Sequence, residues 1–202
     1  MLRTREQARL SPIDVNPFRT AAGLKLIAAW ERWRGRRLLP VESDIEPDDI
    51  ASIVPQLMLL EYRGWDEVTF RWTGGQISEG LGQSLEGSNY LDLARSDVRA
   101  HRAERMARQM AQPCGACMVN IHRVETGILM PVEVVSLPVA PDRDDLPPLI
   151  IAVAAPSFSE MRMEGSSPQN LRERATEYFC FDIGAGLPEP VPDDFVAPEQ
   201  GG

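Results

Sequence analysis

Five strand-like segments occur in two groups, and this order restricts the fold more than any other feature of the sequence. In chain order they cover residues 57–62, 68–72, 117–124, 129–137 and 149–155. The first two flank a short turn and form a hairpin. Helical and glycine-rich sequence separates this hairpin from the other three. Because strands and helices are segregated in this way, we expect an α+β fold, in which a five-stranded antiparallel sheet carries short helices on one face.

A helix is predicted over residues 20–34, ahead of the strands. Leu26, Trp30 and Trp33 recur at helical spacing with Ile27 beside them, and Gly35 follows as a stop signal. Two tryptophans on one face provide a large apolar area. This face either packs on the body of the domain or forms a dimer or partner surface. The residues alone leave both interpretations open.

Further helices are expected at residues 46–54, 97–110 and 167–178, with short helical turns at 77–81. Pro47 suits the first position of the helix at 46–54. Asp97 is expected at or near the N-terminal cap of the helix at 97–110. The apolar stripe of that helix consists of Ala103, Met106, Ala107 and Met110.

The chain divides into five parts along its length. We expect a flexible arm (1–19), an N-terminal helix (20–35), the main domain (36–160), a C-terminal extension (161–183) and an acidic tail (184–202). The tail is rich in proline and glycine, so it is predicted to be disordered.

The charge and the cysteine content bear on partners and location. The chain of 202 residues carries 21 Lys and Arg against 30 Asp and Glu, a net charge of −9, which would repel nucleic acid. No apolar run approaches the roughly 20 residues of a spanning helix, and the first residues lack the apolar region of a signal peptide. Three cysteines fit a reducing compartment. We expect a cytoplasmic protein with no nucleic-acid partner and no membrane insertion.

Few residues carry chemistry that stands out. Cys114 and Cys117 form a CxxC motif, which in other settings is a zinc half-site or a redox pair. Here the motif follows a helix and precedes a strand, so no helix N-terminus acts on a thiol. The plainer interpretation is a turn and a small buried residue at Cys117. His101 lies on the arginine-rich face of its helix, which we expect to face solvent, so it is a poor haem ligand. No sequence motif brings an acid, a base and a nucleophile together, and we expect neither enzyme activity nor a metal.

Several segments carry a family resemblance. They are Leu39-Pro40, residues 44–50 and 55–60 ahead of and into the first strand, residues 70–75 at the second strand and its glycine exit, the loop 82–87, and residues 137–140. In order and spacing they resemble the single-domain PAS proteins common in alphaproteobacteria. Ser84 stands where the family's G-x-D-L-x-G loop has aspartate, and Gly75 where a threonine is common. The resemblance covers about residues 30–158.

The resemblance implies a PAS fold and signalling by binding. It implies a small apolar cavity between sheet and helices, with a few polar groups. The expected lining is Trp72, Ile77, Leu81, Tyr90, Leu91, Met106, Met110, Val119, Ile121, His122, Val132, Val134 and Val153. It also implies a homodimer through the helix that precedes the core, here through Leu26, Ile27, Trp30 and Trp33.

We therefore predict a regulatory module that binds a small apolar ligand or a signalling partner, with no cofactor and no colour. The first alternative is an interaction adaptor whose core is filled and binds no ligand. The weaker alternative is a metal or redox protein that uses the CxxC motif and His122.

Overall fold

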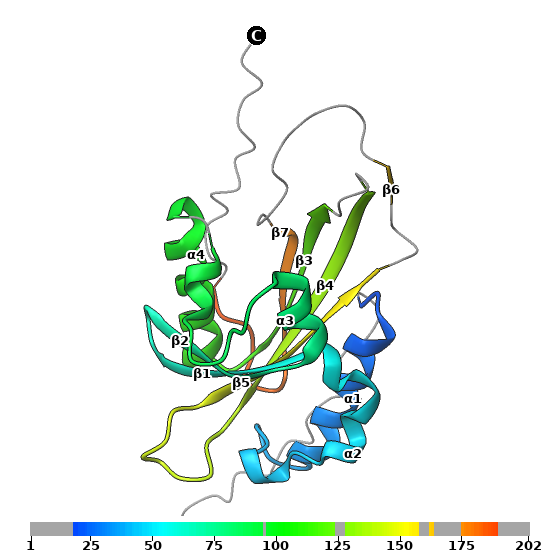
Figure 1. The fold of residues 1–202 in the computed structure, drawn as a ribbon. Helices are drawn as coiled ribbons and strands as arrows, with labels where there is room; N and C mark the ends of the chain where they lie inside the picture. Colours follow the sequence, from blue (N-terminus) through cyan, green and yellow to red (C-terminus); the bar gives the residue numbers. More distant parts are fainter. Residues whose placement is uncertain (1–17, 95, 124–127, 158–161, 164–174, 190–202) are drawn as a thin grey trace, which may run out of the picture.

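The computed structural model describes residues 18–94, 96–123, 128–157, 162–163 and 175–189, and Figure 1 shows their arrangement. The helices are α1 (Ala21–Arg34), α2 (Pro47–Ile50), α3 (Gly75–Leu81) and α4 (Ser96–Ala111), with 3₁₀ turns η1 (Glu42–Asp44), η2 (Ala51–Gln56) and η3 (Tyr90–Leu93). The strands are β1 (Leu57–Gly64), β2 (Glu67–Thr73), β3 (Gly115–Arg123), β4 (Ile128–Val139), β5 (Leu149–Pro156), β6 (Arg162–Met163) and β7 (Ala175–Phe181). Within these ranges, no helix has both the length and the apolar character that crossing a membrane requires.

The strands form one antiparallel sheet in the order β2-β1-β5-β4-β3-β7, with β6 paired to β4. The run from β2 to β3 is the five-stranded antiparallel sheet that the sequence predicts. The α+β class is therefore confirmed, and β7 extends the sheet at one edge.

The helix predicted over residues 167–178 is wrong where the structure describes it. Residues 175–181 form β7, which pairs with β3. Phe179 and Phe181 lie on one face of this strand, with ring centroids 5.9 and 5.1 Å from that of Phe18. Alternating aromatic residues suit a strand that buries one face, and here that preference prevails. Residues 167–174 lie outside the described part of the chain.

The first residues of the predicted disordered tail are also placed against the domain. The backbone amides of Gly184 and Gly186 donate to Asp182 Oδ1 at 2.6 and 2.9 Å. Gln112 Nε2, at the end of α4, donates to the Ala185 carbonyl at 3.1 Å. The ordered domain thus extends beyond residue 183, and residues 190–202 lie outside the described ranges.

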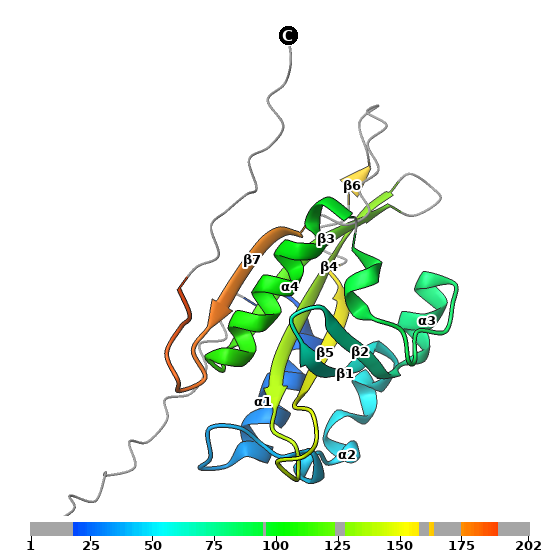
Figure 2. The same cartoon turned by 90° about the vertical axis from the view of Figure 1, so that its left-hand side faces the viewer.

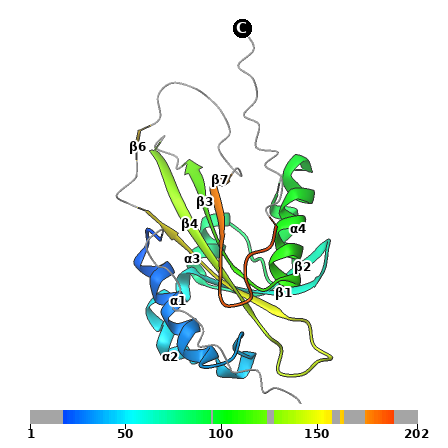
Figure 3. The ribbon, with the colours of Figure 1, turned by 180° about the vertical axis from the view of Figure 1, so that it is seen from behind.

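Helices cover both faces of the sheet (Figures 2 and 3). The predicted helical face carries α3, η3 and α4, while α1 and α2 cover the opposite face. The alternation of side chains in β5 shows how both faces are used. Ile151 and Val153 belong to the core cluster under α1, whereas Ile150 and Ala152 belong to the cluster that includes Met106 of α4.

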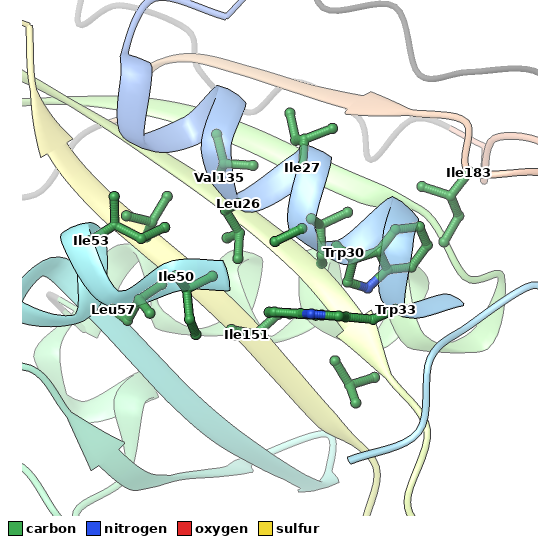
Figure 4. Packing of buried hydrophobic residues seen from close by; sticks show 14 of the residues in the cluster. Leu26, Ile27, Trp30, Trp33, Ile50, Ile53, Leu57, Val135, Ile151 and Ile183 are labelled. Atoms are coloured by element: carbon green, nitrogen blue, oxygen red, sulfur yellow. The ribbon is translucent and has the colours of Figure 1, made fainter. Parts of the chain in front are cut away.

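The face of α1 predicted for a dimer is buried in the chain's own core (Figure 4). Leu26, Ile27, Trp30 and Trp33 are 0%, 1%, 0% and 6% exposed. Trp30 Nε1 donates to the Pro138 carbonyl at 2.9 Å, so its one polar group is satisfied. The structure corrects the prediction of a partner surface at these four residues, because their apolar area already packs on β4 and β5.

Gly74 lies where the chain leaves β2 and passes close to η2. A Cβ atom there would lie 2.2 Å from the Val54 carbonyl oxygen and 2.5 Å from the Pro55 carbonyl carbon. Both are backbone atoms, so neither can move aside without shifting η2.

We expect Gly74→Ala to lower the free energy of unfolding by about 1–3 kcal/mol through overpacking. The matched control is Gly80→Ala in α3, where a Cβ meets nothing within 4 Å. That change should be neutral or stabilising by up to about 1 kcal/mol, because alanine favours helix. Urea denaturation followed by circular dichroism compares the two, and equal midpoints would contradict the close approach at Gly74.

Candidate functional site

A small pocket of about 60 Å³ lies between α4 and the sheet, on the face opposite α1. It is lined by Met58, Leu60, Tyr90, Val98, His101, Arg102, Arg105, Met106, Gln109, Ala116, Met118, Asn120, Val134, Ser136, Ala152 and Tyr178. This space admits a few groups of the size of water.

The pocket face of α4 is more polar than the sequence pattern suggests. The α4 residues in the lining recur at helical spacing, from Val98 through His101 and Arg105 to Gln109. His101, Arg102 and Arg105 all line the pocket, so the prediction that this face of α4 points to solvent is wrong for these three residues. Arginine stems pack on apolar surface while their guanidinium groups keep polar contacts, so an Arg-rich face can turn inward.

Two aromatic rings hold the arginines of the pocket. The guanidinium carbon of Arg105 lies 4.0 Å from the ring centroid of Tyr178 on β7, and that of Arg102 lies 5.0 Å from the ring of Tyr90 on η3. Such stacking is favourable between a cation and the face of an aromatic ring. Among the lining residues that the structure describes there is no Asp or Glu, so the charged side chains described there are basic.

Gln109 forms the buried polar floor beside the pocket. Its Nε2 atom donates to the Cys114 carbonyl at 3.1 Å and lies 3.3 Å from both the carbonyl and the hydroxyl oxygen of Ser136. These contacts join α4 to the start of β3 and to β4. They leave Ser136 and Asn120 at the sheet side of the pocket.

Of the predicted pocket residues, Tyr90, Met106 and Val134 line the pocket. The others fall into three groups: Ile77, Leu91, Met110 and Val132 pack in the adjacent core; Val119, Ile121 and Val153 lie on the α1 face; Trp72, Leu81 and His122 are exposed.

A β-bulge explains the position of Trp72. The register of β1 and β2 pairs Leu59 with Trp72 but Leu60 with Phe70, so Arg71 is the extra residue. One extra residue sends the following side chain to the opposite face. Trp72 therefore does not share a face with Val68 and Phe70, as simple alternation predicts, and it is 37% exposed.

The register of β3 explains the second group. Met118 pairs with Val134 and Asn120 pairs with Val132, which places Met118 and Asn120 on the pocket face. Val119 alternates with them and lies opposite Glu133, on the α1 face. The predicted lining took the apolar residues Val119 and Ile121 of β3, which lie on the α1 face, whereas the pocket face carries Met118 and Asn120.

The two cysteines of the CxxC motif lie on different faces of the sheet. Cys117 packs in the core under α1, where burial and the nearby Glu133 carboxylate raise the pKa of its thiol to about 12. Cys114 is buried, and its interaction with Cys180 of β7, together with burial, raises the pKa of its thiol. The motif therefore does not act as a unit, because the sheet separates its thiols. Within the described ranges, no group of three or more His, Cys, Asp or Glu is placed to hold a metal ion.

The Cys114–Cys180 pair adjoins the pocket. Tyr178, which lines the pocket, has its hydroxyl oxygen 3.3 Å from Cys180 Sγ. Burial and the hydrogen bond with Cys180 raise the pKa of the Tyr178 hydroxyl. Neither Tyr178 nor Cys180 was among the predicted site residues: Tyr178 fell in the helix predicted over 167–178, and Cys180 followed it. The alternation of Phe179 and Phe181 was the available signal for a strand.

Comparison with known proteins gives one family match. A family model described as a PAS domain matches residues 18–152, which span α1 to the first half of β5. No curated protein matches the chain.

Proposed function

The chain belongs to the PAS domain family, and on that premise we propose that it is a regulatory module that binds a small anion between α4 and the sheet. PAS domains are sensory and regulatory modules and are generally not catalytic. We propose no catalytic activity for this chain. We keep the cytoplasmic location as part of it, because all three cysteines are free thiols.

The observation that carries the proposal is the charge of the pocket lining. Arg102 and Arg105 line the pocket beside His101, and none of the lining residues in the described part of the chain is an Asp or Glu. A guanidinium group matches a carboxylate or phosphate in geometry as well as charge. This lining favours an anion of about the size of acetate or phosphate over the apolar ligand expected from the sequence.

A ligand bound at this site would act on the edge strand of the sheet through the contact between Arg105 and Tyr178. Arg105 stacks on Tyr178, so an anion that draws the guanidinium group into the pocket changes a contact between α4 and β7. Gln109 holds the same helix to β3 and β4. We propose that occupancy alters the position of α4 and β7, and that a signalling partner responds to this edge of the domain.

The test is calorimetric titration of the full chain with acetate and, separately, with inorganic phosphate. We expect a single saturable site for at least one of them, with affinity reduced by about tenfold or more in Arg102→Gln and in Arg105→Gln, since each charged hydrogen bond contributes roughly that much. Arg108→Gln is the control, because it removes the same charge from the same helix while Arg108 pairs with Glu104 outside the pocket. Unchanged affinity in both pocket variants would refute the anion site.

The second candidate is an adaptor that binds no ligand. It is supported by the small volume of the pocket and by the packing of Ile77, Leu91, Met110 and Val132 into the neighbouring core. A native mass spectrum of freshly purified protein separates the two candidates. Bound mass released on denaturation supports the ligand-binding module, whereas bare chains with no anion titration support the adaptor. The same spectrum reports the number of subunits, so it also tests the predicted homodimer.

A further inference from the structure

We propose that Cys180 and Cys114 are a hydroperoxide-responsive thiol pair, in which Cys180 is oxidised first and a disulfide to Cys114 then links β7 to β3. This inference concerns a different site from the anion pocket, and it does not require that the pocket bind any ligand.

The geometry of the sheet brings the two thiols together. Cys180 pairs with Ala116 across β7 and β3, so Cys114 lies two residues along on the same face. The interaction with the other thiol is the largest influence on the pKa of each cysteine, which agrees with this placement. Closing a disulfide requires the sulfur atoms to approach to about 2.05 Å. In the described part of the chain β7 lies at the edge of the sheet, next to β3, so closing the disulfide requires a movement of this edge strand relative to β3.

The surroundings divide the roles between the thiols. Cys114 is 0% exposed, whereas Cys180 is only partly buried, so an oxidant reaches Cys180 first. The hydrogen bond from Cys114, assisted by the Tyr178 hydroxyl and the Arg105 charge, lowers the pKa of Cys180 to about 6 against the opposing effect of burial. The same hydrogen bond, together with burial and the nearby Asp182 carboxylate, raises the pKa of Cys114. At neutral pH Cys180 is therefore the thiolate nucleophile and Cys114 the protonated resolving thiol.

The chemistry balances with hydrogen peroxide as the oxidant. The Cys180 thiolate attacks one peroxide oxygen, the O–O bond breaks, an S–O bond forms, and the leaving hydroxide takes a proton to become water. The resulting sulfenic acid then reacts with Cys114. The S–S bond forms, the S–O bond breaks, and the Cys114 proton leaves with the hydroxyl group as a second water. Both cysteines are oxidised, and the peroxide is reduced to two molecules of water.

Oxidation of Cys180 would also change contacts at the neighbouring pocket. The thiolate that accepts from the Tyr178 hydroxyl is consumed, and the ring of Tyr178 is the one on which Arg105 stacks. A disulfide here changes the surroundings of both side chains, so the redox state of β7 and the position of α4 are coupled.

The test is oxidation of the reduced full chain by hydrogen peroxide, followed by peptide mapping without reduction. We expect a Cys114–Cys180 disulfide in the wild type and in Cys117→Ser, which is the matched control because Cys117 lies on the other face of the sheet. Cys114→Ser should instead accumulate a Cys180 sulfenic acid that dimedone traps. If the wild type forms no disulfide, or joins Cys117 in place of Cys114, the proposal is wrong.

A second measurement tests the role of Tyr178 as a positioning residue. The rate of Cys180 oxidation in the wild type should rise with pH through about 6 and level off above it, because the thiolate reacts and the thiol does not. Tyr178→Phe removes one hydrogen bond to the thiolate, so the midpoint should move to higher pH while the plateau rate changes little. A profile identical to that of the wild type would show that Tyr178 is only structural.

Discussion

Trp30→Ala is expected to lower the free energy of unfolding by about 3–5 kcal/mol, the range for removing a buried large aromatic side chain. Trp30 is 0% exposed and lies between α1 and the sheet (Figure 4). The variant leaves a cavity and also leaves the buried Pro138 carbonyl without the indole donor at 2.9 Å. Urea denaturation at equilibrium measures the loss.

Two further variants separate the contributions. Trp30→Phe keeps most of the apolar volume and loses the hydrogen bond, so it should cost less than Trp30→Ala. Trp65→Ala removes the same kind of side chain from a position that is 52% exposed and should change stability by less than about 0.5 kcal/mol. If Trp30→Ala instead gave a protein of wild-type stability that changed from dimer to monomer, α1 would be a partner surface after all.

Glu133→Ala should lower the free energy of unfolding by about 3 kcal/mol, because it leaves three donors without their acceptor. Glu133 lies in β4, is 1% exposed, and accepts from the backbone amide of Arg19 at 2.7 Å, the amide of Thr20 at 3.1 Å and the Thr20 hydroxyl at 2.6 Å. The first turn of α1 contains no acidic residue, so this carboxylate supplies the negative charge that a helix N-terminus favours.

The matched control is Glu177→Ala. Glu177 also contacts Arg19, through an ion pair of 2.6 Å, but its side chain is 51% exposed. Exposed ion pairs contribute about 1 kcal/mol or less, so this variant should remain close to the wild type. Equal losses from the two variants in the same denaturation series would mean that Glu133 does not anchor α1.

The elements of the fold were predictable because their signals are local. Alternating or continuous apolar residues placed five strands, and the glycine and proline signals placed the turns between them. The spacing of Leu26, Trp30 and Trp33 placed α1, although it did not reveal which surface that face contacts. Residues 175–181 are the exception. Their local preference between helix and strand is weak, and pairing with β3 makes them a strand.

The site was less predictable, because it depends on parity and register. The extra residue at Arg71 reverses the orientation of Trp72, and no composition rule indicates that bulge. The pocket takes Asn120 and Ser136 from β3 and β4, and it takes Arg102 and Arg105 from a helix face that a hydropathy pattern assigns to solvent.

The sequence by itself determined the order of helices and strands, because each depends on residues a few positions apart. The tertiary structure decided which groups meet across long separations. Glu133 caps a helix that begins more than a hundred residues earlier, and Cys114 pairs with Cys180 while the sheet separates it from Cys117. No local sequence pattern predicts either contact. Contacts between distant segments form only when the register of the sheet and the packing of α1 bring the two side chains together.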